Sequence, residues 1–228
     1  IKIFSFILNK IGKSCTLLDG NQDSSNNLSW VLTFDDGFSS DYKIVLPILN
    51  KHEVNALFFI VPSLIGSPNY LSWDQVSILS NNGMEIGSHS LNHYDMSTLS
   101  SSKRIIELND SKKIIEDKIS KEVISFSFPF GRNNNDAIND VFECGYKYCF
   151  TSKPGLFNNN DKLIPRISLN CKFSNEDIIK MIKRCEENRF DVSLAYNVKE
   201  YSKKILGMDN YWRLRSILMD KFSFLKNN

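Results

Sequence analysis

Short apolar runs alternate along this chain with stretches whose apolar residues recur at helical spacing. The first run, L-S-W-V-L-T-F at 28–34, ends abruptly at D-D-G. It is rich in β-branched and aromatic residues and is closed by Gly37, so it predicts a buried strand that opens into a loop. A helical pattern at 42–51 and a second apolar run at 54–61 follow. The predicted order is therefore strand, helix, strand.

The same alternation continues further along the chain. Helices are predicted at 73–83, 101–118, 136–145 and 175–188, and strands at 84–89, 123–131, 146–152 and 191–196. Strands that alternate with helices indicate parallel β/α units, and so many units in one small domain predict an α/β fold, either a barrel or a strongly curved open sheet. In both cases the chemistry belongs at the carboxyl ends of the strands.

Length and composition favour one enzyme-sized domain with appendages. A chain of 228 residues can bury one substantial core but is short for two independent enzyme domains. The net charge of +2 is too small to favour nucleic acid as a partner. No run approaches the ~18 apolar residues that a transmembrane helix needs. The five cysteines are an odd number without a C-x-x-C pair, so reduced and mostly buried thiols are expected.

The two ends of the chain differ from its centre. An apolar stretch after Lys2 is either an ordinary first helix or the trimmed end of a signal or anchor, and we favour the helix because a small-residue cleavage site is lacking. Near the other end, 199–226 has aromatic and basic residues at helical spacing. This helix either packs over the open end of the barrel, which we favour, or makes peripheral membrane contact through 207–228.

Four side chains carry the candidate chemistry. His89 and His93 follow a predicted strand, and on one helical turn their spacing would put both imidazoles on the same face. Asp35 and Asp36 follow another strand directly, where two adjacent buried charges are costly unless a cation compensates them. One acid could then bind a metal while the other accepts a proton. Loop capping by the histidines and a simple D-D-G turn are the alternative interpretations.

An Asp, His, His set leaves open positions for water and a substrate carbonyl, as a hydrolytic zinc site requires. T-F-D-D-G at 33–37 and G-M-E-I-G-S-H-S-L-N-H at 83–93 resemble the first two motifs of the polysaccharide deacetylases with a NodB-homology domain, carbohydrate esterase family four. The resemblance implies that Asp35 is the catalytic base. It also implies that Asp36, His89 and His93 hold one divalent ion, with zinc as the first expectation.

F-S-F-P-F-G at 126–131 is similar to the third motif of that family, which lines the substrate groove. Pro129 and Phe130 would then contact substrate, and the Phe130 N–H would help to form the oxyanion hole. The resemblance covers roughly residues 30–197 and implies a distorted (β/α) barrel with fewer than eight units. We therefore expect an N-terminal helix and polar linker at 1–29, the deacetylase domain at 30–197 and a helical extension at 198–228.

Two departures from the family pattern concern catalysis. Ser127 stands where the third motif usually has an Arg. Arg166 in I-P-R-I is a candidate substitute that would reach in from another strand end, with a surface ion pair as an equally open interpretation. The last motif normally ends in a His that acts as general acid, but here L-A-Y takes its place. Tyr196 could donate instead, although a phenol with a pKa near ~10 suits neutral pH poorly. Otherwise Asp35 and water protonate the leaving group, or turnover is slow.

The predicted reaction is removal of an N-acetyl group from an amino sugar in a polysaccharide, oligosaccharide or glycolipid. Two alternatives stay open: a glycan-binding member of the family that has lost turnover, and a deformylase or deacetylase acting on a lipid-linked sugar. Trp73 and Tyr94 follow strand ends and are candidate sugar-binding residues, whereas Trp30 is expected in the core. The expected partner is an acetylated glycan or a lipid-linked sugar, and the sequence leaves the oligomeric state open.

Overall fold

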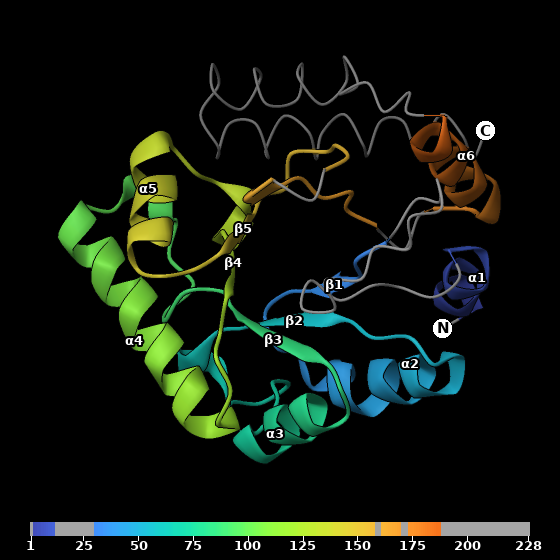
Figure 1. The fold of residues 1–228 in the computed structure, drawn as a ribbon. Coiled ribbons are helices and arrows are strands. Elements are labelled where there is room, and N and C mark those ends of the chain that lie inside the picture. Colours follow the sequence, from blue (N-terminus) through green and yellow to red (C-terminus); the bar gives the residue numbers. More distant parts are fainter. Residues whose placement is uncertain (1, 12–29, 158–160, 170–172, 188–228) are drawn as a thin grey trace, which may run out of the picture. The chain divides into compact units, whose positions relative to one another are not determined.

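Parallel strands joined by helices form the centre of the structure, a computed structural model that describes residues 2–11, 30–157, 161–169 and 173–187. These residues lie within one compact unit, Ile1–Arg189. Within them, six parallel strands pair in the order of the chain (Figure 1). The strands are β1 Thr33–Phe34, β2 Leu57–Ile60, β3 Glu85–Ser88, β4 Ser125–Ser127, β5 Tyr148–Phe150 and β6 Leu163–Ile164.

Helices connect the successive strands from β1 to β5 and lie on the outer side of the curled sheet (Figure 1). The predicted α/β fold, a distorted (β/α) barrel with fewer than eight units, is therefore confirmed. Because every strand pair is parallel, the carboxyl ends of all the strands meet at one edge of the sheet. The helices are α1 Lys2–Ile11, α2 Leu46–His52, α3 Trp73–Asn81, α4 Ser101–Ile119, α5 Asn135–Glu143 and α6 Asn175–Glu186, and a π-helical turn at Asp41–Val45 leads into α2.

Local sequence explains where several helices begin. Ser72 and Gln75 form a capping box at the start of α3, in which the Gln75 N–H donates to Ser72 Oγ at 3.2 Å and the Ser72 N–H donates to Gln75 Oε1 at 3.0 Å. Ser174 and Asp177 make the same arrangement before α6. These reciprocal bonds satisfy amide groups that have no partner within the helix.

The sheet is buried on both faces, which explains the continuous apolar runs of the sequence. Phe58, Phe59 and Phe126 are completely buried, and Phe34 stacks on Phe58 with ring centroids 5.0 Å apart. Gly87 on β3 makes room for its neighbour, because a Cβ at that position would lie 2.6 Å from ring carbons of Phe59. Close packing of β2 against β3 therefore requires glycine at this position.

Some predicted elements differ from those observed. The described part of β1 is shorter than the predicted strand, and β6 was missed because only its two residues pair with β5. Trp30 packs against an apolar cluster with residues of α1 and α6, as expected. Among the described cysteines, Cys149 and Cys185 are buried and Cys144 is partly buried, and all three are free thiols.

Several expectations fall on residues outside the described ranges: Cys15, Cys171, the strand at 191–196, Tyr196 and the extension at 198–228. The domain limits at 29/30 and 197/198 likewise stay predictions. Among the helices that the structure describes, none combines the length and the apolar character needed to cross a bilayer.

Candidate active site

The loop after β1 carries the two acidic residues. Asp35 and Asp36 follow Phe34 directly, and both Asp36 and Gly37 have left-handed backbone conformations, with φ of 78° and 74°. Asp tolerates this region better than most residues, and glycine adopts it without a steric penalty. Gly37 is also buried, and a Cβ there would lie 3.3 Å from Ile60. The D-D-G sequence therefore makes a tight turn at the carboxyl edge of the sheet.

The histidines reach the same edge from a loop after β3. Residues 89–95 form no regular helix, so the predicted helical turn is wrong. Ser90 and His93 have left-handed backbone conformations instead, with φ of 65° and 60°, and the His93 N–H donates to Ser90 Oγ at 2.9 Å. A sharply turned loop, and not helical periodicity, brings the two imidazoles together.

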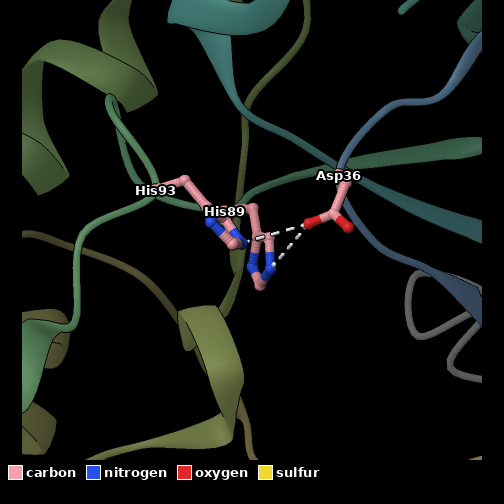
Figure 2. A group of neighbouring side chains, drawn as sticks. All are labelled: Asp36, His89 and His93. Carbon is pink, nitrogen blue, oxygen red and sulfur yellow. Dashed lines mark ion pairs between the residues drawn. The ribbon is translucent and has the colours of Figure 1, made fainter. Parts of the chain in front are cut away.

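Asp36, His89 and His93 form one compact group of potential metal ligands (Figure 2). Asp36 Oδ1 lies 3.4 Å from His89 Nε2 and 3.1 Å from His93 Nε2. The three ligand atoms lie within 4.8 Å of one another. Carboxylate oxygen and imidazole nitrogen are donor atoms that zinc and related divalent ions accept. These side chains could therefore hold one divalent cation.

The protonation of His89 supports this assignment. His89 is 2% exposed, and its Nδ1 lies 2.7 Å from the Ser127 carbonyl oxygen, which can only accept a hydrogen bond. Burial lowers the pKa of His89, against the opposing effects of Asp35, the Ser127 carbonyl and Asp36. The neutral imidazole thus carries its proton on Nδ1, and its Nε2 lone pair faces the Asp36 carboxylate. Two facing acceptors need a cation between them, so the group fits a bound metal ion.

Asp35 lies beside this group and is held by Arg166. Arg166 Nη1 donates to Asp35 Oδ1 at 2.7 Å and Nη2 donates to Asp35 Oδ2 at 2.8 Å, a two-pronged geometry that adds direction to the charge attraction. Partial burial raises the pKa of Asp35, but the charge and hydrogen bonds of Arg166 outweigh it, so the pKa is lowered overall. Asp35 Oδ2 also lies 3.9 Å from His89 Nε2. A charged carboxylate therefore lies next to the candidate metal ligands.

Arg166 lies two residues after β6 and so reaches Asp35 from another strand end, as predicted, although the bounds of that strand were not. Its side chain is 13% exposed, and its guanidinium lies over the Phe59 ring at 5.5 Å, so the pair with Asp35 is not a surface ion pair. Arg166 Nη2 also donates to Ser127 Oγ at 2.8 Å. Ser127 occupies the position where the family motif usually has an arginine. Arg166 therefore brings a guanidinium to the place where that arginine would lie.

Phe130 lies at the edge of the group. It has a left-handed conformation with φ of 59°, its side chain is 61% exposed, and its ring makes an edge contact with His93 at 4.7 Å between centroids. No acceptor for the Phe130 N–H is found among the described residues. Arg132 lies 5.6 Å from the Phe130 ring centroid and pairs with Asp95 at 2.7 Å. The Arg132–Asp95 pair therefore joins the loop of Phe130 to the loop of His93.

The other predicted groove residues lie in different surroundings. Tyr94 follows His93 and is 54% exposed, and Pro129 is buried beside Phe130. Trp73 is the first residue of α3 and packs against the main core, with the Lys118 ammonium 5.9 Å from its ring centroid. Their roles in substrate binding stay predictions.

Asp41 is a buried acid near the site that sequence reasoning missed. Burial and the charge of Asp36 raise its pKa to about 7, while a bond from the Phe38 amide acts in the opposite direction. Its Oδ2 atom is buried without a hydrogen-bond partner in the described structure. Its polar type within a helical pattern gave no signal, because its burial depends on the tertiary fold.

Comparison with known proteins agrees with this arrangement. A family model described as polysaccharide deacetylase matches residues 22–149, more than half of the chain. The YxkH protein of Bacillus subtilis is 29% identical over 125 residues, which are 55% of this chain and 45% of that protein. The poly-beta-1,6-N-acetyl-D-glucosamine N-deacetylase of Staphylococcus aureus is 28% identical over 171 residues, 68% of this chain and 57% of that protein. The chain thus spans about half of the length of these relatives.

Solved structures share the fold. The deacetylase PplD of Streptococcus pyogenes, in complex with acetate, superposes with a TM-score of 0.70 at 24% identity, over 78% of this chain and 85% of that one. A de-N-acetylase from Aggregatibacter actinomycetemcomitans gives a TM-score of 0.67 at 20% identity, over 78% of this chain and 86% of that one. With the family match over more than half of its length, the chain belongs to the polysaccharide deacetylase family.

Proposed function

We propose that this chain is a zinc-dependent hydrolase that removes an N-acetyl group from an amino sugar in a polysaccharide, oligosaccharide or glycolipid. The single observation that carries the proposal is the approach of the Asp36 carboxylate to two imidazole nitrogens, His89 Nε2 and His93 Nε2. The Staphylococcus aureus relative, named for acting on a polymer of N-acetylglucosamine, supports this class of substrate.

Zinc is the proposed ion because a donor set of two imidazoles and one carboxylate is typical of hydrolytic zinc sites, which keep a position open. When bound, such an ion lowers the pKa of water and polarises the acetyl carbonyl. The Ser127 carbonyl oxygen holds Nδ1 of His89 and so keeps Nε2 available to the ion.

Asp35 would act as the general base. Arg166 keeps its carboxylate ionised and fixes both oxygens, so that Asp35 can take a proton from the attacking water without rotating away. The Phe130 N–H would donate to the oxyanion that develops on the acetyl oxygen, since it has no acceptor among the described residues. Tyr196 remains a candidate donor to the leaving amine.

The test combines metal content with product analysis on the purified chain. The wild-type chain should retain zinc and release acetate from N-acetylglucosamine oligomers. The Asp36→Ala, His89→Ala double variant should lose both properties. His52→Ala is the matched control, because His52 lies on α2 and is the one histidine of the sequence outside the candidate metal site.

Other products would identify the alternatives. Release of formate from a formylated lipid-linked sugar, without release of acetate, would identify a deformylase. Binding of oligomers by the zinc-loaded chain without any release would identify a glycan-binding protein. Absence of zinc from the wild-type chain, even after dialysis against the metal, would refute the proposal.

A further inference from the structure

Two aromatic side chains in the loops that follow β1 and β2 have no part in the chemistry described so far. Phe38 and Tyr70 stack face to face, with ring centroids 5.2 Å apart and 21° between the planes. Phe38 is 40% exposed, unlike the completely buried phenylalanines of the sheet. An exposed aromatic stack of this kind offers a flat apolar surface to a ligand.

Backbone hydrogen bonds hold the two rings in place. The loop after β1 and the loop between β2 and α3 meet in an isolated antiparallel bridge between Phe38 and Tyr70. The Ser39 N–H donates to the Asn69 carbonyl at 2.7 Å, and the Leu71 N–H donates to the Gly37 carbonyl at 2.9 Å. Because both strands of the bridge are fixed, a ligand that stacks on the rings need not order them first.

The stack is close to the proposed reaction centre along the chain. Phe38 is only two residues after Asp36, and two residues span at most ~7 Å even when fully extended. This is comparable with the size of one pyranose ring. A sugar that neighbours the one under attack would therefore come within reach of the Phe38 ring.

Resting on the deacetylase function proposed above, we propose that Phe38 and Tyr70 form a binding site for the pyranose ring adjacent to the acetylated sugar. The C–H face of a pyranose is apolar and matches an aromatic face, while its hydroxyl groups stay in water. Two rings are also far too small a surface for a stable protein partner, which needs roughly 800 Å² on each side. The preferred substrate is accordingly an oligomer or polymer.

The experiment compares chain lengths. Kinetics of acetate release are measured for N-acetylglucosamine as monomer, dimer and longer oligomers, using the zinc-loaded full chain and its Phe38→Ala and Tyr70→Ala variants. The variants should raise KM for the longer oligomers by about tenfold, while kinetics on the monomer and zinc content stay unchanged. Tyr70→Phe should retain the behaviour of the wild type, because it keeps the ring.

Controls separate this role from a general effect on folding. Ile44→Ala removes a side chain of similar exposure, 44%, from the neighbouring π-helical turn. It should leave KM unchanged for both the monomer and the longer oligomers. If Phe38→Ala unfolds, Phe38→Leu keeps most of the apolar volume without the flat face and should show the same selective loss. Equal effects on monomer and oligomer, or no effect on either, would overturn the proposal.

The proposal can also be tested apart from catalysis. If the wild-type chain releases no acetate, binding of the same oligomers to the zinc-loaded chain is measured by calorimetry. Weaker oligomer binding by Phe38→Ala would then support the sugar site although the hydrolase proposal had failed. Oligomer binding that is unchanged by Phe38→Ala and Tyr70→Ala, or undetectable in the wild-type chain, would overturn it.

Discussion

Replacement of Arg166 by Gln should move the acid limb of the pH–rate profile to higher pH. Arg166 contacts both oxygens of Asp35, at 2.7 and 2.8 Å, and its charge outweighs the partial burial that raises the pKa of Asp35. Without that charge, burial remains and Asp35 keeps its proton to higher pH. The proposed base would then be lost at mildly acidic pH, where the wild-type chain still has it.

The size of the shift follows from the surroundings of Asp35. An adjacent arginine lowers the pKa of a carboxyl by about 1–3 units. Because 32% of the Asp35 side chain is exposed, water screens the pair, so we expect the midpoint of the acid limb to rise toward the lower end of this range. A metal ion bound at Asp36 would lower the pKa of Asp35 in both proteins, so the difference between them should persist.

The assay is acetate release at saturating zinc between mildly acidic and mildly basic pH, with kcat/KM plotted against pH. Arg166→Lys keeps the charge and loses the two-pronged geometry. The midpoint of its acid limb should therefore stay close to that of the wild-type chain, while kcat/KM is only partly retained. Lys162→Gln is the matched control, since it removes an exposed positive charge just before β6.

Two results would refute the reasoning. An unchanged midpoint in Arg166→Gln would show that Arg166 does not control the ionisation of Asp35. A uniform fall at every pH that accompanies loss of zinc would show that Arg166 supports the structure of the site instead. Unfolding of the variant is monitored by its melting temperature.

Three further predictions concern other positions. Gly87→Ala should lower the free energy of unfolding by about 1–3 kcal/mol in urea titrations, because its Cβ would lie 2.6 Å from a neighbouring ring; unchanged stability would contradict the packing. Arg132→Ala should lower kcat at unchanged zinc affinity, since Arg132 pairs with Asp95 and contacts the ring of Phe130, the proposed oxyanion donor. Asp95→Asn should act in the same direction, and loss of zinc would contradict this prediction. Asp41→Asn should raise the melting temperature more at pH 8 than at pH 5. The pKa of Asp41 is about 7 in the folded chain, above the ordinary 3.8, so the stability of the wild-type chain falls as pH rises between these two values. A larger increase at pH 5 than at pH 8 would contradict this prediction.

Local patterns were sufficient to predict much of this molecule. The apolar runs that become β2 to β5 are continuous because a parallel sheet is buried on both faces, and the intervening stretches have helical periodicity. Since parallel strands end at one edge, the positions of Asp36 and His89 within two residues of the ends of β1 and β3 were enough to predict their convergence.

Other features depended on residues far apart in the chain. Arg166 lies 131 residues after Asp35, and β6 is too short to produce a recognisable pattern. The spacing of His89 and His93 alone suggested a helical turn. The actual loop conformation of His93 depends instead on a hydrogen bond to Ser90.

The sequence by itself determined the order of strands and helices, the acidic turn and the histidine pair, because periodicity and turn chemistry are local properties. Only the tertiary structure decided which guanidinium holds Asp35, which carbonyl orients His89 and which rings stack beside Gly37. The physical reason is that each of these contacts joins separate loops at the edge of the sheet. Their distances depend on the twist and packing of all the strands between them, which no local pattern encodes.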